Sequence, residues 1–400
     1  MKPRILLVAT CPLPSTALLA IAFADIGCVV EVVCPRGHPA ANTRAVSRIH
    51  AFRERTALSS LNKAIEESHP DLVLPCNDPA ILYLHRLYSR FHLRGTSGAG
   101  MLEVLERSLG PAESHPVTIA RSRLIARASS GGIRVPNTAV VKTVNDLRAW
   151  LAQNGFPAML KADGTSGGKG VQIILADTAV EPVFERLSAL STAVGAPVLN
   201  VQRFIPGRDA TSSVACWKGK IVASITCEVL ETVCARGAAS VLRLIDNPEM
   251  HQCAGHLIKQ LGLSGIYGFD FRLEQQTGKA HLIEMNARPT QISHLAMGTG
   301  HDLPVALHAM LSGKSIPPTK RMTEKDTLVL FPQEWNRDPS SKFLASGFHD
   351  VPWREPGLIK SCIDNFVTGA KNCAQARMKH RLLQMLHKRT RQRQVDGPVA

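Results

Sequence analysis

The sequence lacks the features of membrane-spanning, disulfide-stabilised and zinc-binding chains. Its 400 residues contain no apolar run near the roughly 18 residues that a membrane helix requires. The ten cysteines are scattered singly, with no CxxC pair and no Cys/His cluster at zinc-ligand spacing. No internal repeat is present. We therefore expect reduced thiols and a cytoplasmic protein.

Aromatic residues are also scarce, which bears on nucleic acid as a partner. They make up 5% of the chain, and no RNA-binding signature or interleaved basic and aromatic face is present. The net charge is nevertheless +15, and residues 371–400 hold eight Lys and Arg against one Asp. Apolar residues recur there at helical spacing from Met378 to Leu386. We predict a basic amphipathic helix that either meets an anionic partner or docks on the body, and we do not expect nucleic acid.

The N-terminus has two interpretations. A basic start followed by an apolar stretch that ends near Ala24 imitates a secretory signal. However, Pro12 and Pro14 interrupt this stretch. The order of Ile5–Ala9, a turn, an apolar helix and Cys28–Cys34 is typical of strand, helix and strand. We favour the second interpretation, in which cleavage would remove the first strand of a sheet.

The chain divides into three parts. Residues 1–115 alternate β-rich runs with helical patterns, as in a parallel α/β sheet. Residues 116–315 start with a helix predicted over Val117–Ala128 and then become strand-rich and glycine-punctuated, and residues 316–400 form a C-terminal extension. Pro75–Pro79 follows one predicted strand, at the edge where open sheets bind ligands. This segment either contacts a substrate or forms an Asx turn and helix cap.

Glycine is concentrated in one short segment. Four glycines fall within Gly164–Gly170, between strand patterns over Ala158–Ala162 and Val171–Leu175. Glycine allows backbone N–H groups to turn toward phosphate oxygens, and Ser166 and Lys169 add a donor and a charge. The spacing is neither that of a Walker loop nor that of a dinucleotide fingerprint. We predict a phosphate-binding loop that closes a hairpin like a lid; the alternative is a bare glycine turn.

A second predicted hairpin carries two carboxylates. If it is centred on Thr277, Asp270 lies opposite Glu284, and the two-residue period puts Asn286 on the same face. Three such oxygen ligands suit Mg²⁺, and two facing carboxylates without a cation would repel each other. Arg288 follows on the same face, where it could neutralise a transferring phosphoryl group. The alternative is a solvated polar hairpin.

In this order the motifs resemble the ATP-grasp superfamily, which includes biotin carboxylase, the carbamoyl-phosphate synthetase large subunit and D-alanine:D-alanine ligase. The resemblance covers roughly residues 117–310. It implies the fold class α/β, with an N-terminal parallel α/β pre-grasp domain over 1–115. A two-lobed ATP-grasp domain of α+β type would follow over 116–315, with its lid lobe at about 140–200.

The resemblance also implies roles for residues. Arg123, with Arg121 as the weaker alternative, and Lys161 match cations that bind phosphate. Lys161 and Arg288 would act at the reacting phosphate, and Asp270, Glu284 and Asn286 match the magnesium ligands. Gln202 departs from the family's frequent Glu. The implied nucleotide-binding set is Arg123, Lys161, Gly164, Thr165, Ser166, Gly167, Gly168, Lys169, Gly170, Gln202, Arg203, Phe204, Ile205 and Asp209.

The activity that the resemblance implies is an ADP-forming ligase dependent on ATP and on Mg²⁺ or Mn²⁺. It would activate a small-molecule carboxylate as an acyl phosphate for attack by an amine. The alternatives are a phosphotransferase that stops at a phosphorylated product and a nucleotide-binding regulator without turnover. Intact candidate ligands speak against the regulator. The family's habit of dimerising predicts a homodimer, and no general base is singled out.

Overall fold

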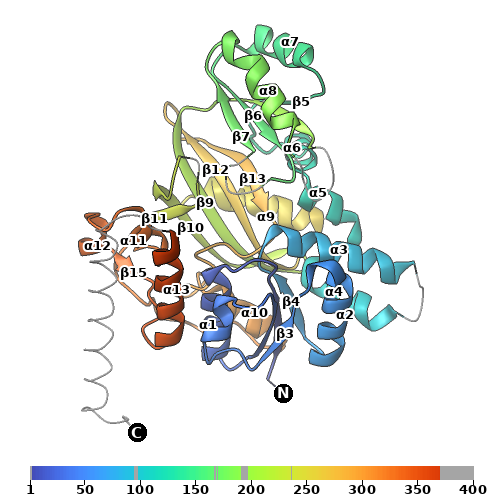
Figure 1. The fold of residues 1–400 in the computed structure, drawn as a ribbon, viewed down its shortest axis with the longest axis vertical. Helices are drawn as coiled ribbons and strands as arrows, with labels where there is room; N and C mark the ends of the chain where they lie inside the picture. Colours follow the sequence, from blue (N-terminus) through green and yellow to red (C-terminus); the bar gives the residue numbers. More distant parts are fainter. Residues whose placement is uncertain are drawn as a thin grey trace.

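The computed structural model describes residues 2–93, 98–165, 168, 170–190, 197–235 and 237–369. The basic helix predicted over 371–400 and three loop residues, Ser166, Gly167 and Lys169, lie outside the described residues. Three sheets form the framework, with a small lobe above a larger body (Figure 1). None of the described helices has the length and apolar character needed to cross a membrane.

The N-terminal part is a parallel sheet with helices on both faces, as expected. Its strand order is β3-β2-β1-β4. Ile5 and Leu7 pack into one core and Leu6 and Val8 into another, which explains why the first strand is apolar throughout. The elements are β1 (Arg4–Val8), β2 (Val29–Cys34), β3 (Arg48–Ala51), β4 (Leu72–Pro75), α1 (Pro14–Asp25), α2 (Ala57–Ser68), α3 (Asp78–His92) and α4 (Ala99–Leu109), with short helices η1 (Pro39–Asn42) and η2 (Glu54–Thr56).

Two helices lead from this sheet into the small lobe. The single helix predicted over Val117–Ala128 is wrong, because the backbone is extended at Ala120 and separates α5 (His115–Ile119) from α6 (Arg121–Ser130). A short helix, η4 (Ala112–Ser114), precedes them. The break makes Arg121 the first residue of a new helix, which decides where its side chain points.

The small lobe is a four-stranded sheet covered on one face by two helices (Figure 1). Alternate residues such as Leu160 and Val201 pack under these helices, so Lys161 and Gln202 belong to the opposite face. The strands, in the order β5-β8-β6-β7, are β5 (Thr138–Val141), β6 (Ala158–Ala162), β7 (Val171–Ile174) and β8 (Leu199–Arg203), and the helices are α7 (Val144–Asn154), η5 (Asp177–Ala179) and α8 (Val180–Ser188). β6 and β7 form the predicted antiparallel hairpin.

The central sheet has seven strands in the order β13-β12-β9-β10-β11-β14-β15. α9 (Pro248–Leu261) covers one face, where Leu257 packs with Phe269. The other face packs on the N-terminal sheet and on α10 (Leu303–Leu311). The strands are β9 (Gly207–Trp217), β10 (Lys220–Thr232), β11 (Ala239–Leu244), β12 (Gly265–Glu274), β13 (Ala280–Asn286), β14 (Thr327–Val329) and β15 (Phe348–His349).

The C-terminal segment is part of the same body. Two of its strands, β14 and β15, extend the central sheet, and Leu328, Leu358 and Ile359 share one hydrophobic core with the N-terminal strands. The boundary expected at residue 315 therefore separates neither two sheets nor two cores. The helices of this segment are α11 (Gln333–Arg337), α12 (Phe343–Ser346) and α13 (Pro356–Gly369).

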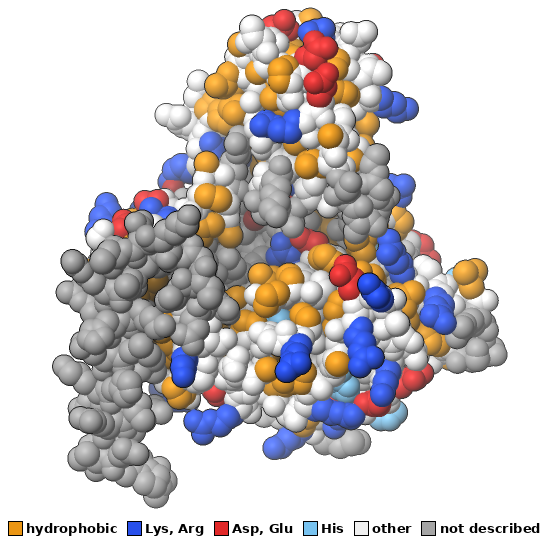
Figure 2. Space-filling model, viewed as in Figure 1, with side chains coloured by type: hydrophobic (Ala, Val, Ile, Leu, Met, Phe, Trp, Pro, Cys, Tyr) orange, Lys and Arg blue, Asp and Glu red, His pale blue; other side chains and the backbone are white. Residues whose placement is uncertain are grey.

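The described surface shows no strong segregation of charge on the face drawn in Figure 2. There, the Lys and Arg side chains of the described residues are scattered over the body among hydrophobic ones rather than gathered into one stripe.

Candidate functional site

Two carboxylates face each other on β12 and β13, as predicted, next to a β-bulge between Asp270 and Phe271. Asp270 is paired with Glu284, and Asn286 lies opposite Gly268. The Thr211 hydroxyl donates to Asp270 Oδ1 over 2.9 Å, and Asn286 Nδ2 donates to Asp270 Oδ2 over 2.9 Å. Burial, with the charge of Glu284 as the next cause, raises the pKa of Asp270 to about 6. The pair therefore favours a cation between its oxygens.

The same residues fit a magnesium ion. The described residues contain no group of three or more His, Cys, Asp and Glu side chains placed to hold a metal. A metal at this hairpin would use Asp270, Glu284 and the Asn286 amide oxygen, with water or phosphate oxygens completing its shell. That donor set is typical of Mg²⁺, which is commonly held by one or two carboxylates together with nucleotide phosphates.

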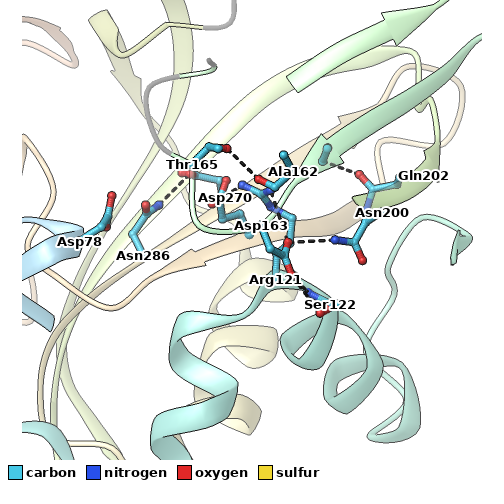
Figure 3. A network of polar contacts seen from close by, with 12 residues as sticks. Asp78, Arg121, Ser122, Ala162, Asp163, Thr165, Asn200, Gln202, Asp270 and Asn286 are labelled. Atoms are coloured by element: carbon cyan, nitrogen blue, oxygen red, sulfur yellow. Dashed lines mark hydrogen bonds and ion pairs between the residues drawn. The ribbon is translucent and has the colours of Figure 1, made fainter. Parts of the chain in front are cut away.

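A buried guanidinium, Arg121, lies against this pair (Figure 3). Its Nη2 donates to Glu284 Oε1 over 2.6 Å, and its Nη1 is 3.8 Å from Asp163 Oδ1. Burial alone would lower the pKa of Arg121, but Glu284 and Asp163 outweigh it and raise that pKa. The Nε and Nη1 groups are buried without a hydrogen-bond partner among the described residues. Such donors are suited to an anionic ligand.

The structure thus brings Arg121 into the site and not Arg123, which the resemblance favoured. Arg123 is exposed. Two positions along a helix turn a side chain by about 200°, so the two arginines lie on different faces of α6. Because the helix break at Ala120 starts α6 at Arg121, it sets the face of the helix on which each arginine lies.

Asp163 ties α6 to the small lobe. Its Oδ2 accepts hydrogen bonds from the backbone N–H and the hydroxyl of Ser122, over 3.2 and 2.9 Å, and its Oδ1 accepts one from Asn200 Nδ2 over 2.9 Å. Asp163 and Asn200 are buried. Because Asp163 is also the residue before the glycine loop, this network links the loop to Arg121 (Figure 3). Arg121 in turn is bonded to Glu284.

Lys161 stands on the face of the small lobe that has no covering helices. Its Nζ donates to Gln202 Oε1 over 2.5 Å, and Gln202 Nε2 donates to Thr138 Oγ1 over 3.1 Å. Burial lowers the pKa of Lys161 to about 7, and the positive charge of Arg121 acts in the same direction. A phosphate group nearby would favour the charged lysine.

The glycine loop is described at four of its seven residues. Gly164 and Gly168 have φ angles of +77° and +75°, which favour glycine. A Cβ on Gly170 would lie 2.0 Å from Thr165 Oγ1, so any larger residue at this position would require Thr165 to move. The Thr165 hydroxyl donates to the Ala162 carbonyl over 2.7 Å.

The predicted adenine segment runs from β8 into β9. The Arg203 N–H donates to the Asn137 carbonyl over 2.8 Å, and the Ile205 carbonyl accepts from Arg272 Nε over 2.9 Å. The Arg203 N–H and the Ile205 carbonyl are therefore already hydrogen-bonded within the protein. The predicted adenine contacts remain predictions for the Arg203 carbonyl and the Ile205 N–H. Arg272 also stacks over the Phe204 ring and forms an ion pair of 2.6 Å with Asp209.

Arg288 lies where the central sheet meets the N-terminal sheet. Its Nε donates to Asp78 Oδ1 over 2.6 Å, and its Nη2 donates to Asn286 Oδ1 over 3.2 Å. Burial would lower the pKa of Arg288, but Asp78 raises it, so the guanidinium stays charged. Asn77 caps α3 by accepting from the Ala80 N–H, which confirms the helix-cap interpretation for that residue.

Sequence reasoning missed the part that Asp163 plays. One signal was available: an acidic side chain two residues after Lys161, inside a loop expected to bind phosphate, would repel the phosphate unless a cation neutralised it. That argument calls for a nearby Arg or Lys but does not say which one, because the partner is 42 positions away from the acid along the chain.

Comparison with known proteins supplies the family. Residues 122–317 match the model of the ATP-binding domain of the carbamoyl-phosphate synthase L chain. Residues 122–317 are thereby identified as an ATP-grasp domain. The matched range contains both hairpins and begins one residue after Arg121. The predicted fold class, with a parallel N-terminal sheet followed by antiparallel sheets, is confirmed.

A curated protein is similar to this chain over part of its length. Acetyl-CoA carboxylase 2 of Oryza sativa subsp. japonica is 25% identical over 162 residues, which are 39% of this chain and 7% of that enzyme. The chain therefore spans only a small share of that relative.

Two solved structures share the fold. One is an N5-carboxyaminoimidazole ribonucleotide synthetase in its ADP complex, with 15% identity, a TM-score of 0.61 and 81% of each chain covered. The other is a biotin carboxylase–ATP complex from Campylobacter jejuni, with 16% identity, a TM-score of 0.61 and coverage of 80% of this chain and 74% of that one.

Proposed function

We propose that this ATP-grasp protein is an ATP- and Mg²⁺-dependent ligase that activates a small-molecule carboxylate for attack by an amine and releases ADP. The observation that carries the proposal is a buried site with a positive and a negative half. Lys161 and Arg121 supply the cations, and Asp270 and Glu284 face each other beside them. A polyanion bound together with a divalent cation neutralises both halves.

In the proposed reaction a carboxylate oxygen attacks the γ-phosphorus of ATP, ADP leaves, and an acyl phosphate forms. The amine nitrogen then attacks the acyl carbon and phosphate departs, while the amine gives up its proton. Lys161, Arg121 and Arg288 hold the charged oxygens of the transferring group in place. Asp270, Glu284 and Asn286 would hold a Mg²⁺ ion, which would neutralise the remaining phosphate charge. Mn²⁺ would fit the same donors.

We assign the nucleotide to the face of the small lobe that has no covering helices. The support is the pair of orphaned N–H groups on Arg121, the tight glycine turns and the depressed pKa of Lys161. The assigned set keeps Gly164–Gly170 and Lys161, and replaces Arg123 by Arg121. Gln202, Arg203, Phe204, Ile205 and Asp209 would border the adenine and ribose.

The partners in this proposal are a small carboxylate, a small amine and a second copy of the chain. Of the two solved structures named above, one is a complex with ADP and the other a complex with β,γ-ATP. The homodimer stays a prediction from the family's habit.

The test is ADP release by the full chain with Mg²⁺ and ATP, screened across pairs of carboxylates and amines with mass-spectrometric identification of the product. A ligase gives ADP, phosphate and a condensed product only when both substrates are present. A phosphorylated product that accumulates without an amine would favour the phosphotransferase instead. Calorimetry that detects no uptake of MgATP or MgADP would contradict the assigned site.

A further inference from the structure

Polar contacts of two neighbouring residues, Asn77 and Asp78, join the N-terminal sheet to the β12–β13 hairpin, which carries the candidate metal ligands. The set starts where β1 and β4 end, because Asn77 Nδ2 donates to the Thr10 hydroxyl over 3.0 Å and to Cys11 Sγ over 2.8 Å. The next residue, Asp78, accepts from Arg288 Nε. Arg288 Nη2 reaches Asn286, and Asn286 donates to Asp270.

The N-terminal end of this set is rigidly built. Asn77 uses its side chain for the α3 cap and for the contacts to the loop after β1, and its backbone position is fixed by β4 beside β1. Asp78 is the first residue of α3, so its carboxylate extends from an anchored point. It reaches a guanidinium that lies 210 positions later in the chain.

The two hydrogen bonds of Arg288, to Asp78 and to Asn286, would differ in strength if a metal were bound at the hairpin. A guanidinium is planar, and bonds to Nε and Nη2 together fix its rotation about the side-chain axis. Under the proposed function the Asn286 amide oxygen would be a ligand of the metal, and sharing it would weaken the Nη2 contact. The bond from Nε to Asp78 is then what keeps the guanidinium plane in place.

Resting on the proposed function, we propose that Asp78 is a positioning residue: it holds the Arg288 guanidinium across the boundary between the N-terminal domain and the ATP-grasp domain, so that the remaining N–H groups of Arg288 face the transferring phosphoryl group. The N-terminal sheet thereby takes part in phosphoryl transfer. Asp78 acts through Arg288 and does not itself bind the nucleotide.

The matched control is another partly exposed Asp–Arg pair, Asp326 with Arg321, whose N–O distance is 2.9 Å. It lies before β14, and neither residue contacts the site residues named above. The variants Asp78→Asn, Asp78→Glu and Asp326→Asn are compared with the wild type in the full chain. Asparagine keeps the size of Asp78 but removes the charge that holds Arg288.

The first readout is the reactivity of Arg288 toward phenylglyoxal, followed by mass spectrometry of the peptide that contains it. We expect Arg288 to be modified severalfold faster in Asp78→Asn, because the guanidinium is released, and at the wild-type rate in Asp326→Asn. An Arg288 that reacts equally fast in wild type and Asp78→Asn overturns the proposal. This measurement needs no turnover.

The second readout is the synthesis of ATP from MgADP and carbamoyl phosphate, which is an acyl phosphate and runs the first step in reverse. We expect kcat to fall by about tenfold or more in Asp78→Asn, the KM for MgADP to stay near the wild-type value, and Asp78→Glu to recover part of kcat. A rise in KM for MgADP with unchanged kcat overturns the proposal, because it would make Asp78 part of nucleotide binding.

The two failures remain distinguishable. If the wild type neither binds MgADP in calorimetry nor forms ATP from any acyl phosphate tested, the proposed function fails. The phenylglyoxal rates then still decide whether Asp78 holds Arg288.

Discussion

The two hairpins that meet at the site, β6–β7 and β12–β13, carry side chains of opposite charge. On each hairpin, burial moves the pKa of one of these side chains in the direction that favours its neutral form. Burial lowers the pKa of Lys161 on the first to about 7 and raises the pKa of Asp270 on the second to about 6. Arg121 stands between them, bonded to Glu284 on one side and near Asp163 on the other. The comparison teaches that burial disfavours the charged form of one group in each half, Lys161 in one and Asp270 in the other. A phosphate chain with its cation supplies what each half lacks.

Removing a carboxylate from the negative hairpin is the strongest way to break this comparison. We expect Glu284→Gln to lower Mg²⁺-dependent turnover by roughly a hundred- to a thousandfold, as when a group that stabilises transition-state charge is lost. ADP release measured against Mg²⁺ concentration checks it. The control is Glu274→Gln, at the far end of the partner strand β12, where the side chain is partly exposed and contacts Thr277 and His281. Equal activity of the two variants would refute the metal assignment.

Removing the arginine that joins the hairpins should have the next largest effect. We expect Arg121→Ala to reduce turnover by roughly a hundredfold, since the guanidinium that contacts Glu284 and faces the phosphates is gone. Arg123→Ala is the matched control on the exposed side of the same helix and should behave as wild type. The reverse order of the two effects would restore Arg123 as the phosphate-binding cation.

The positive hairpin can be tested by pH. Lys161, with its pKa lowered to about 7, is charged below that pH and neutral above it, and bound phosphate favours the charged form. The affinity for MgADP should therefore fall as pH rises above 7, by up to about tenfold per pH unit until the pKa in the complex is passed. Calorimetry between pH 6 and 9 measures it. Lys161→Arg should flatten the profile; an unchanged profile would point to a different group.

The variant with the smallest expected effect tests the link between the two hairpins through Asp163 and Arg121. Asp163→Asn keeps an oxygen that can accept from Ser122 but removes the charge near Arg121. We expect a loss of about 2 kcal/mol in unfolding free energy, the range for a buried hydrogen-bonding group with charge, and a fall in turnover smaller than that of Arg121→Ala. Denaturant unfolding and ADP release check both. Asp146→Asn, in the exposed capping box of α7, should change turnover little; a larger loss there would remove any special part for Asp163.

Local patterns in the sequence predicted both hairpins. Alternation about Thr277 predicted that Asp270 faces Glu284, but the structure reaches this pairing through a β-bulge between Asp270 and Phe271, which the sequence analysis did not foresee. The β6–β7 hairpin follows from glycines between two apolar runs. The parallel N-terminal sheet could also be predicted, because buried strands such as Leu72–Pro75 have a distinctive composition. In each case the signal lies in residues close together in the sequence, either the two strands of one hairpin or the composition of a single strand.

The sequence by itself determined the two hairpins, the glycine loop and the kinds of residue that a phosphate and a metal need. Only the tertiary structure decided that Arg121 and not Arg123 enters the site, that Asp78 meets Arg288, and that β14 and β15 extend the central sheet. The physical reason is how far apart along the chain the contacting residues lie. A register is fixed by hydrogen bonds and periodicity within a few residues, whereas these contacts depend on where a helix breaks and on how distant segments pack into one shared core.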